Sequence, residues 1–245
     1  MRVTYILKKI EWQYKNNQKF SYEKKLFFFK IYRPISFYLT VFFIFLRFKP
    51  NFITFLNFLL ILGSCLFLLK GFTLFGLLFL LLSFIFDLID GNIARYYQSN
   101  NSFGKIADGF VDSLIFLVFF FYSISLIINE QKIYNENITL LIGALTSVSF
   151  LFKICFDIRC NYVLIRDEKR NKNIEYNNFF KKINYFMYIK NIINDFYLGI
   201  PLILILSLIT GYPTYGLIFY FFIIFFFSNL EILLKLFLLW KKFNR

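Results

Sequence analysis

The chain has 245 residues, of which 59% are hydrophobic and 24% aromatic, and its mean hydropathy is +0.62. This composition excludes a soluble globular domain, because a domain of this length cannot bury so many apolar side chains. The absence of histidine, and three cysteines without C-x-x-C spacing, exclude the usual Cys/His zinc sites and histidine acid-base chemistry. We therefore expect an all-α integral membrane protein.

The first 50 residues are predicted to form a basic, cytoplasmic N-terminal region. Residues 1–19 are polar and lack the apolar core of a secretory signal, so cleavage is not expected. The apolar run Phe37–Phe48 is too short to cross a bilayer. Because basic and aromatic residues precede it at 24–32, we expect an amphipathic helix that lies at the membrane surface.

Residues 51–245 are predicted to form one membrane domain with six transmembrane helices. A hydrocarbon core of about 30 Å requires about 20 helical residues. The apolar stretches that approach this length are Asn51–Leu69, Phe72–Tyr97, Phe103–Ile128, Ile138–Tyr162, Phe196–Ile209 and Thr214–Trp240. The fifth stretch is short and must borrow residues upstream of Phe196 to span.

Positive charge is distributed asymmetrically over the predicted loops. With the N-terminus inside, the cytoplasmic segments are residues 1–50, 98–102 and 163–195 and the tail from Lys241. Only Lys70 and Lys132 fall in loops on the other side, as expected for a protein whose short basic loops stay in the cytoplasm. Topology and anionic lipid thus explain the net charge of +14, and we expect no nucleic-acid partner.

Four aspartates stand inside two of the predicted membrane helices. Asp87 and Asp90 share one helix face, and so do Asp108 and Asp112. The connection 98–102 is short, so the two helices are expected to be antiparallel neighbours whose carboxylates converge. Each ionised group in a medium of low dielectric costs several kcal/mol unless it is neutralised. The cluster therefore predicts a site for one or two Mg²⁺ ions, with Mn²⁺ as an alternative.

Small and basic residues stand beside these aspartates. Gly91 and Gly104 let a flat or charged ligand approach the backbone, and Arg95 offers a planar fork for phosphate oxygens. Together they predict a diphosphate pocket. Two alternatives stay open: aspartates paired with lysine while the glycines only pack helices, and an ion-coupled membrane transporter. A membrane prenyltransferase typically has two separate aspartate-rich motifs, whereas this chain has one composite motif.

The aspartates belong to a longer signature. The pattern D-x-x-D-G-x-x-A-R, eight residues, G-x-x-x-D-x-x-x-D is met by Asp87, Asp90, Gly91, Ala94, Arg95, Gly104, Asp108 and Asp112. It resembles the signature of the CDP-alcohol phosphotransferase (CDP-alcohol phosphatidyltransferase) family. The resemblance implies that Asp87, Asp90 and Asp108 bind metal, and that Asp112 contacts metal and acts as the general base. It also implies that Gly91, Ala94, Arg95 and Gly104 contact the CDP-alcohol.

A second similarity lies upstream. Pro50-Asn51-Phe52-Ile53-Thr54 resembles the P-N-x-I-T element that opens the first spanning helix in this family. Asn51 is a good N-cap and Thr54 lies in the exposed first turn, so we expect both to contact the nucleotide. The family's six spanning helices and interfacial N-terminal helix are similar to the elements predicted above, and its members often form homodimers.

The resemblance implies a Mg²⁺-dependent enzyme of phospholipid synthesis. Such an enzyme transfers a phosphatidyl group from a CDP-alcohol, most commonly CDP-diacylglycerol, to an acceptor hydroxyl and releases CMP. We expect the pocket to face the cytoplasm of a bacterial cell. Headgroup transfer from CDP-choline or CDP-ethanolamine to diacylglycerol shares the same signature and stays open.

The signature does not identify the acceptor alcohol. Three cations on the adjoining helices can hold a phosphorylated acceptor, such as glycerol phosphate or inositol phosphate: Lys105, Lys153 and Arg159. A structural alternative is that Lys153 pairs with Asp157, four residues later. Glu231 and Lys235 in the last helix can likewise satisfy each other.

Overall fold

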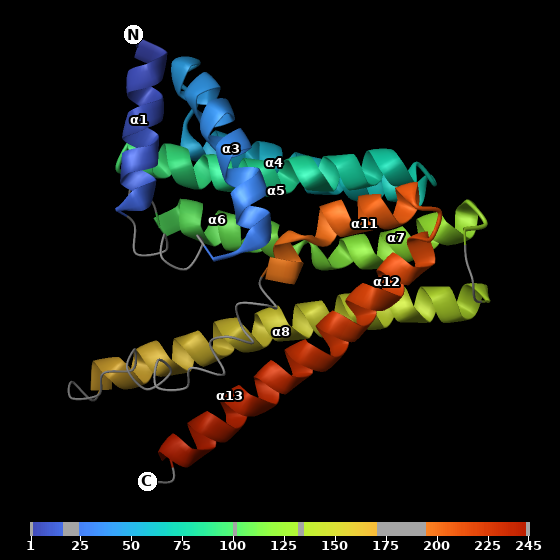
Figure 1. The fold of residues 1–245 in the computed structure, drawn as a ribbon. Coiled ribbons are helices and arrows are strands. Elements are labelled where there is room, and N and C mark those ends of the chain that lie inside the picture. The colour runs from blue at the N-terminus through green and yellow to red at the C-terminus, as the bar shows by residue number, and fades with distance from the viewer. Residues whose placement is uncertain (1, 17–24, 100–101, 132–134, 171–194, 244–245) are drawn as a thin grey trace.

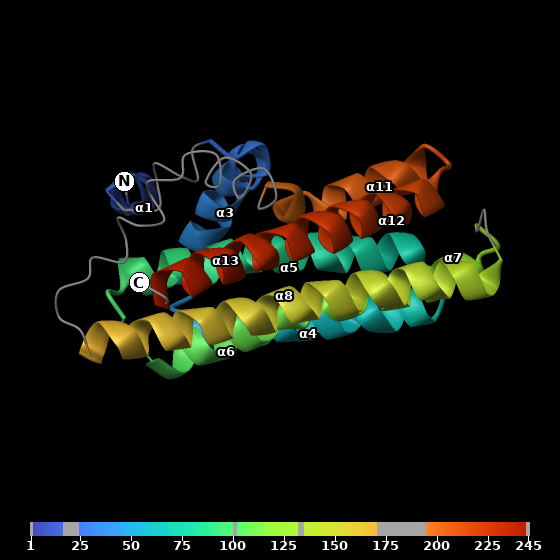
Figure 2. The same cartoon turned by 90° about the horizontal axis from the view of Figure 1, so that it is seen from below.

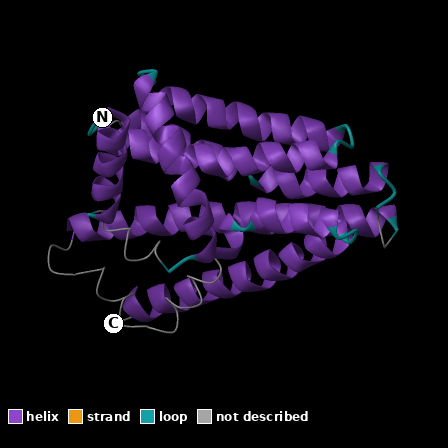
Figure 3. Ribbon diagram, turned by 45° about the horizontal axis from the view of Figure 1, so that its top comes forward, coloured by secondary structure: helices purple, strands orange, loops and turns teal. Residues whose placement is uncertain are grey.

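The structure is a computed structural model that describes residues 2–16, 25–99, 102–131, 135–170 and 195–243. All regular secondary structure in these ranges is helical (Figure 3). Six described helical stretches are long and apolar enough to cross a membrane. The predicted all-α membrane class is therefore confirmed.

The helix that carries the first two aspartates is packed tightly against its predecessor. α4 (Pro50–Leu69) and α5 (Thr73–Tyr96) are joined by a turn at Gly71, whose φ of 81° favours glycine. A Cβ at Gly76 would lie 2.6 Å from the nearest side-chain atom of α4, so only glycine allows this approach. Ser64 Oγ donates a hydrogen bond to the Gly76 carbonyl at 2.8 Å. These contacts fix α5 beside α4.

The predicted span Phe103–Ile128 is two helices. α6 (Ser102–Ser113) and α7 (Phe116–Ile128) are separated by a turn in which backbone hydrogen bonds reach back three residues. The span itself is confirmed, because Ile106–Ile128 is one of the six stretches that are long and apolar enough to cross a membrane. The turn means only that it is not one regular helix. No glycine or proline marks the break in the sequence. Because α6 ends at Ser113, Asp112 lies in its last turn.

The C-terminal half is built on one long helix and a rod of three consecutive helices. α8 (Glu136–Arg170) extends beyond its predicted end at Tyr162. α12 (Pro213–Phe222), the π-helical η1 (Ile223–Phe227) and α13 (Ser228–Phe243) form a continuous rod, which Figure 1 shows beside α8. The rod corresponds to the predicted span Thr214–Trp240.

The predicted fifth span is interrupted. α11 (Ile200–Ile209) has only 10 residues, and residues 195–198 form a separate helical turn that ends at Gly199. Pro201 stands at the start of α11, where a new helix begins readily. The prediction of one continuous helix at 196–209 is therefore wrong. The residues before Asp195 that it was expected to borrow lie outside the described part of the structure. α3 (Phe27–Phe45) is instead one of the six stretches of sufficient length.

Two N-terminal helices, α1 (Arg2–Lys15) and α3, run steeply across the direction of α4 and α5 in perpendicular views (Figure 1, Figure 2). α3 has 19 residues because the aromatic stretch before Phe37 is also helical. The predicted bounds 37–48 are therefore wrong, and the interfacial position stays a prediction.

α3 is held at its N-terminus and along one face. The Asp195 carboxylate accepts hydrogen bonds from the backbone N–H groups of Phe27 at 2.9 Å and Phe28 at 3.0 Å. This satisfies two donors that a helix start leaves unpaired. The buried face of α3 packs against α5, and the opposite face exposes a stripe of large apolar side chains: Phe27, Ile31, Ile35, Tyr38, Phe42 and Phe45.

Candidate active site

Three of the four predicted aspartates lie together. Carboxylate oxygens of Asp87, Asp90 and Asp108 lie within 4.8 Å of one another. The first two come from one face of α5, and the third comes from α6, which packs against α4. Asp90 is only 7% exposed, and the other two are half-buried. We call these residues the three-carboxylate group.

The three-carboxylate group fits a divalent metal. Carboxylates this close repel one another when ionised, so a cation between them lowers their energy. All the donor atoms are carboxylate oxygens, the hard ligands that Mg²⁺ and Mn²⁺ prefer. Asp87, Asp90 and Asp108 would be its ligands.

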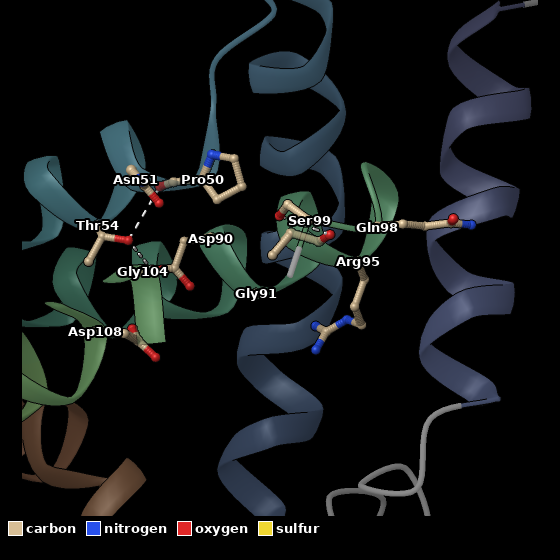
Figure 4. A pocket seen from close by; sticks show the side chains of 11 residues that line it. Pro50, Asn51, Thr54, Asp90, Gly91, Arg95, Gln98, Ser99, Gly104 and Asp108 are labelled. Atoms are coloured by element: carbon tan, nitrogen blue, oxygen red, sulfur yellow. Dashed lines mark hydrogen bonds between the residues drawn. The ribbon is translucent and has the colours of Figure 1, made fainter. Parts of the chain in front are cut away.

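A cavity of about 480 Å³ is bordered by two of these aspartates (Figure 4). Its walls come from the start of α4, the end of α5, the turn that follows and α6. It is lined by Pro50, Asn51, Thr54, Asp90, Gly91, Ala94, Arg95, Gln98, Ser99, Gly104 and Asp108. The structure thus brings all six predicted CDP-alcohol contacts to one place: Asn51, Thr54, Gly91, Ala94, Arg95 and Gly104. We call this space the larger cavity, because it exceeds in volume the second cavity described below.

The start of α4 reaches the three-carboxylate group through Thr54. Its hydroxyl donates a hydrogen bond to Asp90 Oδ2 at 2.9 Å, one of the dashed lines at Thr54 in Figure 4. The prediction that Asn51 caps α4 is wrong, because Lys49 holds the cap position and Pro50 follows at N1. Proline suits N1, where its fixed φ matches the helix and its missing N–H is not needed. Asn51 is instead exposed and borders the larger cavity.

Arg95 lies across Gly91 from the carboxylates in Figure 4. Its Nη2 donates a hydrogen bond to Asn92 Oδ1 at 2.7 Å. A Cβ added at Gly91 would lie 3.5 Å from Arg95 Nη2, which is an ordinary contact distance. Packing in the protein therefore tolerates a side chain at Gly91, and any requirement for glycine there comes from a ligand.

Asp112 lies outside the three-carboxylate group. It is exposed and lines a second cavity, of about 270 Å³, together with Asp87. The other lining residues are mainly apolar: Ile61, Phe84, Ile115, Phe150, Ile154, Leu198 and Ile200, with Asn57, Ser83 and Tyr197 as polar members. Asp87 thus connects the three-carboxylate group with a cavity of different chemistry.

Lys153, a predicted acceptor ligand, belongs to an ion network between α8 and α13. Its Nζ lies 3.1 Å from Glu231 Oε2 and donates a hydrogen bond to the Tyr197 hydroxyl at 3.0 Å. Lys235 Nζ contacts Glu231 Oε1 at 2.7 Å and Asp157 Oδ1 at 2.5 Å. Asp157 therefore pairs with Lys235 and not with Lys153, whereas the expected pair of Glu231 and Lys235 is present. Lys153 approaches the second cavity only through Tyr197.

The other two acceptor candidates lie elsewhere. Arg159 is exposed on α8 and lines neither of the two cavities. Lys105 belongs to α6, but its side chain lies outside the described part of the structure. The predicted contacts of Lys105 and Arg159 with an acceptor therefore stay predictions.

Several lining residues were missed from the sequence. Asn57 stands one turn after Thr54 on the same face of α4, and this polar position in an apolar helix was a usable signal. Gln98 and Ser99 lie in the turn after α5, where no periodicity indicates the direction of a side chain. Tyr197 reaches the second cavity from a distant part of the chain.

The geometry agrees with a comparison of protein families. A model of the family CDP-alcohol phosphatidyltransferase matches residues 47–192, a region that contains all four aspartates and every residue of the larger cavity. No curated protein and no solved structure matches the chain. Because the match covers more than half of the sequence, the chain belongs to the CDP-alcohol phosphatidyltransferase family.

Proposed function

We propose that the protein transfers a phosphatidyl group from CDP-diacylglycerol to the hydroxyl of an acceptor alcohol and releases CMP. One observation carries the proposal: the six predicted CDP-alcohol contacts line a single cavity that is bordered by Asp90 and Asp108. A nucleoside diphosphate needs polar contacts along its length and compensation of charge at its phosphates. The larger cavity offers the polar contacts, and the adjoining three-carboxylate group can hold the cation that compensates the charge of the phosphates.

Each residue of the larger cavity has a role in this proposal. Arg95 binds phosphate oxygens with its planar donors. Asn51 and Ala94 contact the nucleotide, and Gly91 and Gly104 let the diphosphate approach the helix backbones. Thr54 orients Asp90 through their hydrogen bond. A divalent cation, Mg²⁺ by preference, held by the three-carboxylate group with a contribution from Asp112, would neutralise charge on the diphosphate.

Asp112 is the proposed general base. It takes the proton of the acceptor hydroxyl as the hydroxyl oxygen bonds to the phosphorus next to the lipid and the bond to the bridging oxygen of CMP breaks. The position of Asp112 on the second cavity supports this role, because an acceptor there can reach the carboxylate without entering the nucleotide site.

We also propose that the end of the bundle with the larger cavity faces the cytoplasm. The exposed cations Arg47 and Lys49 stand at this end, beside Pro50, as the distribution of charge in membrane proteins favours. CDP donors and soluble acceptors would then enter directly. α3 would lie along the membrane surface, with its apolar stripe toward lipid.

Headgroup transfer from CDP-choline or CDP-ethanolamine to diacylglycerol is a second candidate. The observation that favours it is the mainly apolar lining of the second cavity, because a lipid acceptor suits such a site beside Asp112. The two candidates use the same residues and differ in which substrate carries the lipid.

One assay separates the candidates. Purified protein with Mg²⁺ is given CDP-diacylglycerol with a panel of alcohols and alcohol phosphates, or CDP-choline and CDP-ethanolamine with diacylglycerol, and CMP release is measured. Release with the first set supports phosphatidyl transfer, and release only with the second supports headgroup transfer. Asp112→Asn should abolish release, whereas Asp157→Asn, the same change outside both cavities, should retain it. Ion flux without CMP release from any combination would exclude both.

A further inference from the structure

Asn92 is the buried centre of a polar group that joins the N-terminal helices to Arg95. The side chain is 1% exposed. Its Oδ1 accepts hydrogen bonds from Arg95 Nη2 at 2.7 Å and from Arg33 Nη1 at 3.2 Å. Its Nδ2 donates to Thr40 Oγ1 at 3.1 Å and to Ser36 Oγ at 3.4 Å. A flipped amide would turn its donors toward two guanidinium groups, so these partners determine its orientation.

The residues of α3 that hold Asn92 are themselves fixed. Arg33 is 7% exposed, and its guanidinium carbon lies 4.5 Å from the ring centroid of Tyr14 on α1 and 5.2 Å from that of Phe29. These are favourable distances for cation–π contact. Thr40 donates a hydrogen bond to the Ser36 carbonyl at 2.6 Å. The Thr40 hydroxyl, which accepts a hydrogen bond from the Asn92 amide, is therefore restrained.

α1 also contacts the end of α5 directly. Lys9 Nζ lies 4.3 Å from the ring centroid of Tyr96, the residue after Arg95. Ile10 of α1 shares a hydrophobic core with Ile89 and Ile93 of α5. α1 and α3 both lie before the family match, which begins at residue 47, and Asn92 occupies a position that the signature leaves unspecified.

We propose that Asn92 is a positioning residue: its amide oxygen holds the Arg95 guanidinium toward the larger cavity, and α3, braced by α1, holds Asn92. This inference rests on the proposed function. A hydrogen bond to a neutral amide oxygen restrains the arginine without cancelling its charge. A carboxylate at this place would neutralise the arginine, whereas an apolar residue would leave it without this restraint.

A double-mutant cycle tests the inference. CMP release by the full-length protein in the presence of Mg²⁺ is measured for wild type, Asn92→Leu, Arg95→Met and the double variant, over a range of concentrations of the CDP donor that the wild type accepts. We expect Asn92→Leu to raise KM for the donor about tenfold and to change kcat less than about twofold. In the Arg95→Met background the same change should alter KM less than about twofold, because residues that act through one contact are not additive. Additive effects, or an unchanged KM for Asn92→Leu, would overturn the inference.

Two further variants separate positioning from loosened packing. Thr40→Val keeps the volume of the side chain and removes only the hydroxyl next to Asn92, so it stays informative if Asn92→Leu fails to fold. We expect it to raise KM about threefold, an increase that also disappears with Arg95→Met. Ser64→Ala removes a buried hydrogen bond between α4 and α5 far along the helices and should leave KM unchanged. An equal rise in KM for Ser64→Ala would overturn the inference, because general loosening would then explain it.

The outcomes distinguish this inference from the function on which it rests. If the wild type releases no CMP from any CDP donor, the proposed function fails and the inference with it. If the wild type releases CMP and the cycle is additive, only the role of Asn92 fails.

Discussion

Two groups of charged side chains inside the helical bundle are organised in opposite ways. The three-carboxylate group brings like charges within 4.8 Å of one another. The ion network of α8 and α13 alternates signs, with nitrogen–oxygen distances of 2.5 to 3.1 Å: Lys153, Glu231, Lys235 and Asp157. The first group borders the larger cavity, whereas the second lines neither of the two cavities described above and contacts Tyr197, which lines the second.

The difference separates charges that are expected to bind a ligand from charges that support the fold. A network of alternating sign neutralises itself, so it holds helices together without an added ion. Carboxylates of like sign repel one another, so we expect them to take up a cation through the adjoining cavity. Both groups contain acidic residues in membrane helices, so the sign of the facing side chains decides between the two roles.

The largest expected effect is on activity at the three-carboxylate group. Asp108→Asn should lower CMP release about a thousandfold, since the loss of about 4 kcal/mol of transition-state stabilisation corresponds to three powers of ten. Thermal unfolding in detergent should show no loss of stability without metal, because one of three repelling charges is removed. Substantial release by this variant would show that the group is not the metal site.

The ion network should respond in the opposite way. Glu231→Gln leaves Lys153 without its carboxylate in a buried position, so we expect a loss of about 3 to 5 kcal/mol of unfolding free energy. KM for the CDP donor should be unchanged in the folded fraction. As a matched control, Lys153→Met with Glu231→Leu should recover much of the stability, because an apolar pair replaces a buried ion pair. Unchanged stability together with lost activity would show that Glu231 belongs to the active site and not to a structural network.

Metal should stabilise only proteins with an intact three-carboxylate group. At about one hundred times its dissociation constant, Mg²⁺ should add about 2.7 kcal/mol to the unfolding free energy of the wild type. Glu231→Gln should keep this response, and Asp90→Asn with Asp108→Asn should lose it. The same increase in the doubly substituted protein would place the bound ion elsewhere.

The smallest expected effect concerns Gly91. Gly91→Ala should raise KM for the CDP donor about fivefold, because the new methyl group enters the larger cavity. Stability should stay unchanged or increase by up to about 1 kcal/mol, since alanine favours helix and its Cβ meets only ordinary contacts. Activity and thermal unfolding measured on one preparation would show whether KM rises while stability is unchanged or increased. A KM equal to that of the wild type would mean that no ligand approaches Gly91.

Some elements could be predicted from local pattern and others could not. α4 and α5 were predicted within one residue at each end, because long apolar runs bounded by Pro50, Gly71 and polar residues leave little choice. The break between α6 and α7 has no such marker, and apolar composition continues through it. The apolar run before α4 was predicted to begin only at Phe37, after a basic stretch, whereas α3 begins at Phe27 and Arg33 is buried inside it.

The sequence by itself determined the membrane class and the spacing that puts Asp87 with Asp90 on one helix face, because hydrophobicity and helical periodicity are local properties. Only the tertiary structure decided which charges meet. Lys153 faces Glu231, Arg33 and Arg95 share the oxygen of Asn92, and Asp112 borders a cavity apart from the other carboxylates. These contacts join residues far apart in the chain, and their geometry follows from how whole helices pack, which no local spacing encodes.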